Sequence, residues 1–139
     1  MNSTQLAAFV CYAIAALIAF IFGTTYLTRK EFMPYHADAV EMEWGEVDKR
    51  FQVLILALLR AVGGGWLAVG ITFVFLLAFP FREQASWALF ALPLVGLAVC
   101  GPTLYATLYV RNNTQAAPPL PFVVVAVVLL VAGFVLSIV

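Results

Sequence analysis

Four long apolar runs, separated by short polar stretches, dominate the pattern of hydrophobic and polar positions. They cover about residues 6–27, 53–80, 86–110 and 120–139. A helix needs about 20 apolar residues to cross the hydrocarbon core of a bilayer, and each run supplies them. We therefore predict an all-α fold, a four-transmembrane-helix bundle that forms a single membrane domain over residues 1–139.

Two features of these runs affect that prediction. The first run lacks a basic start and is longer than the ~7–15 apolar residues of a signal peptide, so we retain it as a span. The third run contains Pro93 and Pro102. Prolines are tolerated inside a membrane bundle and are expected to bend the helix.

The longest polar stretch, residues 28–52, lies between the first two spans. Pro34 suits the first position of a short helix, and Asp48 suits the N-cap of the second span. On the short helix, one face collects its apolar side chains, which are Met33, Ala37, Val40 and Trp44. We predict an amphipathic helix that lies in the membrane interface, with Trp44 at the depth of the headgroups.

Charge distribution predicts the orientation of the chain. The loops on one side of the predicted membrane carry Arg29, Lys30, Lys49, Arg50 and Arg111, and the other side carries Arg82 alone. Basic residues favour the cytoplasm. We expect segment 28–52 to be cytoplasmic and both termini to be periplasmic.

The overall composition excludes other classes of protein. The chain is 65% hydrophobic and 10% charged, so lipid must solvate most of it. Its net charge of zero argues against nucleic acid as a partner. Cys11 and Cys100 lie in apolar runs, and a single histidine is too few for a zinc site. We predict no metal and no cofactor.

Arg60 is the most informative polar residue, because it interrupts the second apolar run. A charge inside the apolar layer costs at least ~2.5 kcal/mol and usually faces the bundle interior. Its neighbours Ala57, Gly63 and Gly64 are small, which would let a helix or a ligand approach. The alternative is that Arg60 marks the edge of the span and extends into the headgroups. We predict that it faces the interior and is paired.

Other residues could complete a pocket between the second and third spans. Tyr105 and Tyr109 could donate hydrogen bonds to a ligand, and Tyr35, His36 and Trp44 could close the pocket from the interface. A catalytic or metal role for His36 with nearby acids is less favoured than a solvated acidic face.

The third span also carries a row of small and polar residues, which are Gly96, Cys100, Thr103, Thr107 and Arg111. Helix packing explains this row better than a cavity does. Ala15, Ala19 and Gly23 form a similar row of small residues in the first span.

Three strings of residues carry a resemblance to known proteins. FMPYH (32–36), ALLRAVGGG (57–65) and PTLYATLYV (102–110) resemble a group of small bacterial four-helix membrane proteins. The layout is loosely similar to that of DoxX-like membrane proteins. The resemblance implies a bacterial inner membrane and a four-helix bundle, and it carries over no catalytic residue.

Our leading hypothesis is a non-enzymatic protein that binds a lipid-like or other apolar small molecule, or another membrane subunit, near Arg60. Membrane lipids are expected partners, and a homo-oligomer is one possible assembly. One alternative is a membrane enzyme acting on a lipid or quinone-like substrate through His36 and Arg60. Another is a small transporter or channel, which at this size requires an oligomer.

Overall fold

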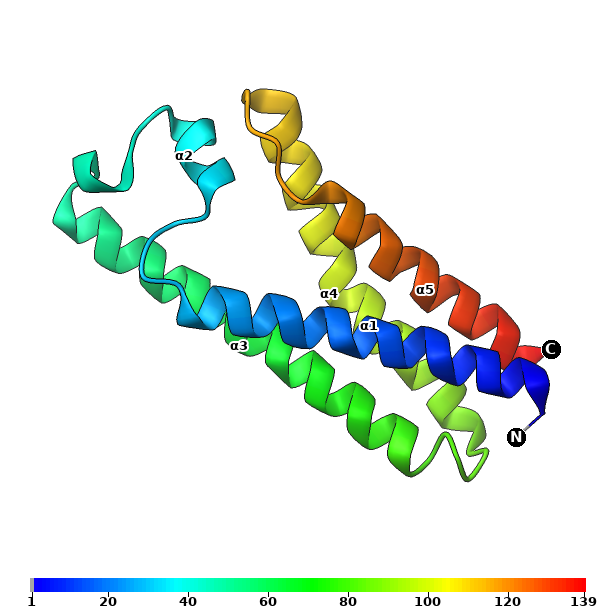
Figure 1. The fold of residues 1–139 in the computed structure, drawn as a ribbon. Coiled ribbons are helices and arrows are strands. Elements are labelled where there is room, and N and C mark those ends of the chain that lie inside the picture. The colour runs from blue at the N-terminus through cyan, green and yellow to red at the C-terminus, as the bar shows by residue number, and fades with distance from the viewer. Residues whose placement is uncertain (1) are drawn as a thin grey trace.

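The computed structural model describes residues 2–139 and consists mainly of α-helices (Figure 1). Its four long helices are α1 (Ser3–Thr28), α3 (Lys49–Ala78), α4 (Ser86–Asn113) and α5 (Leu120–Ile138). All four are long and apolar enough to cross a membrane. The short helix α2 (Pro34–Val40) and the 3₁₀ turn η1 (Trp44–Glu46) lie between α1 and α3. The predicted four-helix bundle is confirmed.

Helix α1 occupies the middle of the packing arrangement. It contacts α3 most extensively and α5 next, and α4 packs on α5, whereas α3 and α4 touch each other only slightly. Both ends of the described chain lie at one end of the bundle, and α2 and η1 lie at the other (Figure 1). We call the latter the interfacial end.

Small residues set the distance between α1 and α3. Ala15, Ala19 and Gly23 are buried along α1. A Cβ atom at Gly23 would lie 2.8 Å from the backbone nitrogen of Leu67 in α3. Small residues of this kind let membrane helices approach closely, as the sequence predicted for the first span.

The centre of the core lies between α1, α3 and α5. Tyr12 of α1 is fully buried and meets the rings of Phe73 and Phe81 edge-on. Gly133 of α5 provides the space for it, because a Cβ atom there would lie 3.0 Å from the Tyr12 ring.

The row of small and polar residues on α4 is also part of the packing. Gly96, Cys100 and Thr107 are buried. A Cβ atom at Gly96 would lie 2.4 Å from the side chain of Leu130 in α5, so a larger residue there would require Leu130 to shift. This placement supports the packing interpretation of the row.

The sequence signals for helix starts are confirmed locally. Pro34 occupies the first turn of α2. Asp48 is the N-cap of α3, and its carboxylate accepts a hydrogen bond of 2.8 Å from the backbone N–H of Arg50. This cap satisfies one of the free N–H groups at the start of the helix.

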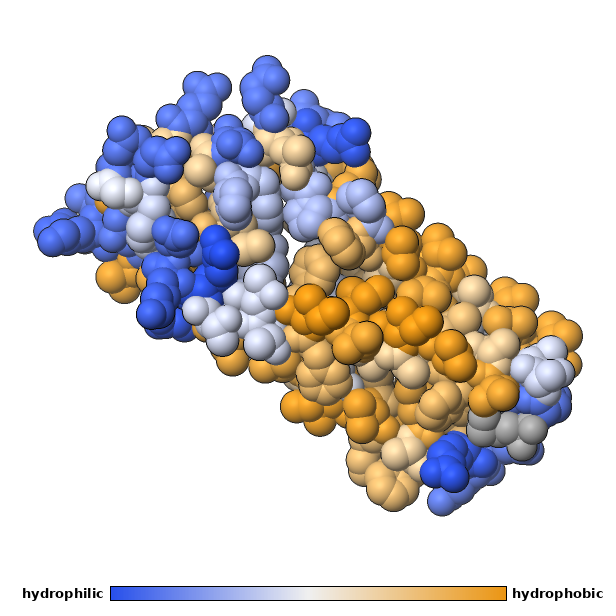
Figure 2. All heavy atoms as spheres, viewed as in Figure 1, coloured by the Kyte–Doolittle hydropathy of each residue, from blue (hydrophilic) through white to orange (hydrophobic). Residues whose placement is uncertain are grey.

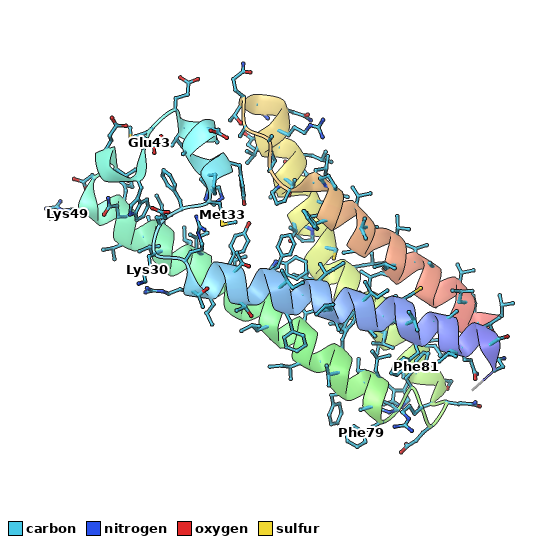
Figure 3. The ribbon with its side chains drawn as sticks, viewed as in Figure 1. Lys30, Met33, Glu43, Lys49, Phe79 and Phe81 are labelled. Atoms are coloured by element: carbon cyan, nitrogen blue, oxygen red, sulfur yellow. The ribbon has the colours of Figure 1, made fainter. Side chains whose placement is uncertain are left out.

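The surface is divided into bands. On the face that Figure 2 shows, an apolar belt crosses the middle of the bundle, and polar residues gather at its two ends, most of them at the interfacial end. Lys30, Glu43 and Lys49 lie at the interfacial end, whereas Phe81 lies near the opposite end (Figure 3). A belt of this kind is what a multi-pass membrane protein presents to lipid.

Candidate ligand-binding groove

Helix α2 is shorter than the helix that the apolar face predicted. It ends at Val40, and Glu41 follows with a left-handed backbone, at φ 52°. Trp44 therefore does not share a helix face with Met33, and Val40 is 56% exposed. Glu41 ends the helix as a left-handed C-cap, and its backbone N–H donates to the carbonyl oxygen of Ala37.

Trp44 instead joins an aromatic cluster around Phe32. Phe32 is 6% exposed, and its ring centroid lies 5.0 Å from that of Trp44 and 6.3 Å from that of His36. Tyr35 stands at a steep angle to His36, with centroids 4.3 Å apart. The structure thus brings together the three aromatic residues that the sequence assigned to the interface, and it adds Phe32 beside them.

Hydrogen bonds hold the segment between α1 and α3 in place. The hydroxyls of Tyr26 in α1 and Tyr35 in α2 are hydrogen-bonded at 2.5 Å, and burial together with this bond raises the pKa of Tyr35. Arg29 donates to the carbonyl oxygen of Phe32 at 3.1 Å. At the other side, Gln52 of α3 donates its side-chain N–H to the carbonyl oxygen of Trp44 at 2.7 Å.

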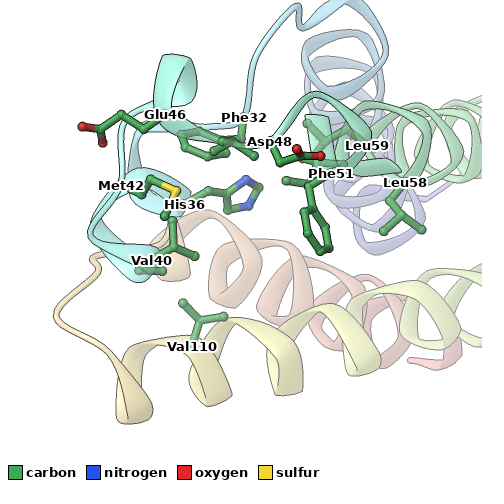
Figure 4. A pocket seen from close by; sticks show the side chains of 13 residues that line it. Phe32, His36, Val40, Met42, Glu46, Asp48, Phe51, Leu58, Leu59 and Val110 are labelled. Carbon is green, nitrogen blue, oxygen red and sulfur yellow. The ribbon is translucent and has the colours of Figure 1, made fainter. Parts of the chain in front are cut away.

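An apolar groove of about 720 Å³ lies between this segment, the first half of α3 and the end of α4 (Figure 4). Its lining side chains are mostly apolar and come from all three places. They are Phe32, His36, Ala39, Val40, Met42, Glu46, Val47, Asp48, Phe51, Ile55, Leu58, Leu59 and Val110. This size and character are typical of sites for small apolar ligands.

His36 contributes an imidazole side chain to the lining of the groove. Its Nδ1 atom accepts a hydrogen bond of 3.3 Å from the backbone N–H of Met33, at the start of α2. Burial, with a smaller contribution from the positive charge of Arg29, lowers the pKa of His36 below its ordinary value. His36 is therefore neutral at pH 7 and presents its ring to the groove (Figure 4).

Neither carboxylate of the groove lining is hydrogen-bonded or ion-paired with His36 in the described structure. Glu46 accepts from the backbone N–H of Glu43, and Asp48 caps α3. Within residues 2–139, no three His, Cys, Asp or Glu side chains are grouped so that they could hold a metal ion.

The prediction that Arg60 faces the bundle interior is wrong for this chain, whereas its pairing with a ligand stays a prediction. Arg60 is exposed, and no hydrogen bond or salt bridge joins it to another residue in the described part of the protein. The reason is the direction of the packed face of α3, which runs through Leu59, Gly63 and Trp66 toward α1. Arg60 lies beside that face rather than on it.

The other predicted pocket residues near Arg60 are also separated from the groove. Gly63 faces the backbone of α1, whereas a Cβ atom at Gly64 would have no atom of residues 2–139 within 4 Å outside its own stretch of helix. Tyr105 and Tyr109 stack on each other with centroids 6.2 Å apart and are 71% and 59% exposed. Their contact with a ligand stays a prediction, now for an outward-facing surface.

Most groove residues were missed at the sequence level. Of the predicted set, only His36 lines the groove, although the groove lies between the same two spans as the predicted pocket. Phe51, Ile55 and Leu59 recur four residues apart and form one row on α3. That row, opposite the apolar side chains of segment 28–52, was the available signal.

The fold and the apolar belt define the class of this protein, which is a polytopic α-helical membrane protein with four spans and a short interfacial helix. No protein-family model matches the chain, and no curated protein or solved structure shows significant similarity to it. Its function must therefore be inferred from the groove itself.

Proposed function

We propose that this protein is a non-enzymatic membrane protein that binds a lipid-like molecule in the groove between α2, α3 and α4. The observation that carries the proposal is a volume of about 720 Å³ whose walls are almost entirely apolar. A groove of this volume holds a molecule with an alkyl chain and removes much of the apolar surface of that chain from water.

The position of the groove supports a ligand that arrives from the membrane. Leu58 and Phe51 on its α3 wall are 58% and 62% exposed, so the apolar lining continues onto the outer surface. Val110 on α4 forms the facing wall. A lipid could enter between α3 and α4, two long helices with little mutual contact.

The proposal includes a location and an orientation. The excess of basic residues at the interfacial end favours a cytoplasmic position for α2 and η1, with both termini periplasmic, in a bacterial inner membrane. In this orientation the groove opens near the cytoplasmic leaflet. A labelling experiment on single cysteines introduced at Thr4 and Asn113 tests it in intact cells. Labelling from outside at position 113, and none at position 4, would reverse the orientation.

Native mass spectrometry of the protein purified in mild detergent tests the binding function directly. The wild type is expected to retain a molecule of lipid mass. Val110→Phe narrows the groove and should reduce retention several-fold, because the larger ring occupies space that the ligand needs. The same spectrum reports whether a second copy or another subunit remains bound.

Val128→Phe is the matched control for this experiment. Val128 lies on α5, is 59% exposed and does not line the groove. Retention should therefore equal that of the wild type. If the wild type retains no lipid, or if the two phenylalanine variants retain lipid equally, the proposed function is wrong.

A further inference from the structure

The hydrogen-bonding groups of the groove restrict the chemistry of its ligand, an inference that rests on the proposed function. Three of the lining side chains are polar, namely those of His36, Glu46 and Asp48. Each has one atom already engaged with the backbone. The remaining hydrogen-bonding atom of each side chain determines which polar group of a ligand it can bind.

His36 offers a hydrogen-bond donor without a positive charge. A backbone N–H can only donate, so the bond from Met33 makes Nδ1 the acceptor. The hydrogen of the neutral ring must then sit on Nε2. Among residues 2–139 no hydrogen bond is made by Nε2, and it is not one of the fully buried unpartnered atoms, so it is accessible. The groove therefore contains an accessible N–H group to which a ligand can present an acceptor.

The charges around His36 do not suit an anion. Glu46 and Asp48 bring carboxylates to the rim of the groove, and no Lys or Arg side chain of the described residues lines it. Arg29 is the cation that acts on His36, but it lies outside the groove lining and donates to the carbonyl oxygen of Phe32. A carboxylate or phosphate placed beside the imidazole would lose its hydration near two like charges.

We propose that the groove selects an uncharged lipid bearing a carbonyl group, which accepts a hydrogen bond from the Nε2–H of His36. The apolar residues of α3 and α4 take the chain, and the carbonyl lies at the level of α2. A plain hydrocarbon fills the same volume but leaves the N–H without a partner. A fatty-acid anion brings an acceptor but meets the carboxylates of the rim.

Three probes with chains of the same length separate these cases, which are methyl oleate, oleate and octadecene. Binding of each to the full-length protein is titrated by native mass spectrometry in a mild detergent at about pH 7.5, where His36 is neutral. Methyl oleate should bind roughly three- to tenfold more tightly than octadecene, the effect of one hydrogen bond. Oleate should bind more weakly than methyl oleate.

Two variants assign the preference to named groups. His36→Phe keeps an aromatic ring and removes the donor, so methyl oleate should fall to the affinity of octadecene while octadecene binding is unchanged. Asp48→Asn retains a good N-cap for α3 and removes a negative charge from the rim. It should strengthen oleate binding several-fold and leave methyl oleate unaffected.

The outcomes distinguish this inference from the proposed function. Equal binding of all three probes, or a preference for methyl oleate that persists in His36→Phe, overturns the selectivity and leaves a lipid-binding groove. Tighter binding of oleate than of methyl oleate also overturns it. If no probe binds and no lipid is retained on purification, both proposals fail together.

Discussion

Gly63 lies where the backbones of α1 and α3 approach each other closely. A Cβ atom there would lie 2.6 Å from the backbone nitrogen of Leu27 and 2.8 Å from the carbonyl oxygen of Gly23. Both are backbone atoms of α1, so neither can move away by a change of rotamer. Gly63→Ala therefore forces α1 and α3 apart over the most extensive helix contact in the bundle.

The magnitude follows from two opposing effects. Alanine favours a helix over glycine by about 1 kcal/mol, and overpacking costs about 1–3 kcal/mol. We expect Gly63→Ala to cost the upper end of the overpacking range, because the backbone of α1 must shift. The expected result is a net destabilisation of about 1–2 kcal/mol. The next residue, Gly64, has open space around its Cβ position in the described structure, so Gly64→Ala should gain up to about 1 kcal/mol.

A thiol-reactive dye measures the difference during heating in detergent. Cys100 is 2% exposed and free, so it reacts when the bundle opens. Cys11→Ala removes the second, partly exposed thiol from the background. Gly63→Ala should melt below the parent protein and Gly64→Ala at or above it. Equal melting of the two variants, or a Gly63→Ala protein more stable than its parent, would refute the close approach of α1 and α3.

Three further predictions concern the interfacial end and α3. Burial lowers the pKa of His36 below the ordinary 6.5, so the folded segment holds the neutral imidazole more readily than the charged one. The packed position of His36 is therefore fully stable above pH 6.5 and loses stability as the pH falls from there toward the folded pKa. Proteolysis of segment 28–52 should speed up over that pH window in the wild type and not in His36→Phe. Arg29, Tyr35 and the rim carboxylates are present in both proteins, so a difference between them reports on His36. Tyr35→Phe removes the hydrogen bond to Tyr26 and should destabilise the docking of α2 by about 0.5–1.5 kcal/mol, measured as faster proteolysis at neutral pH; an unchanged rate would mean that the bond does not hold the segment. Arg60→Leu should leave the melting temperature within error of the wild type, because its side chain is exposed and unpaired in the described structure, and a loss above about 1 kcal/mol would mean that Arg60 has a partner.

The sequence predicted the helices well because length and apolarity alone define a membrane span. The cap at Asp48 and the start at Pro34 were also predictable, since both depend on local chemistry. The face of α3 that packs against α1 was not predictable. In lipid, the inner and outer faces of a helix are equally apolar, so polarity does not distinguish them.

The glycine run shows the same difficulty at single-residue level. Gly63 and Gly64 are adjacent and chemically identical, yet successive helix positions point about 100° apart. Gly63 faces the backbone of α1, whereas the Cβ position of Gly64 has open space around it in the described structure. The groove was missed for a related reason. It forms because α2 ends at Val40 and lets the chain fold back, and a left-handed residue at Glu41 leaves no sequence signal as clear as a glycine.

The order of contacts along the chain has a consequence for biosynthesis. Helices α1 and α3 can pair as soon as α3 has entered the membrane, since their interface needs no later residue. Tyr12 is different, because its ring packs against Gly133 of α5. A nascent chain released before α5 is inserted would expose the Tyr12 side of α1 and the α5-facing row of α4 to lipid. Helix α5 thus completes the packing of α1 and α4, and a chain without it exposes two helix interfaces that the bundle buries.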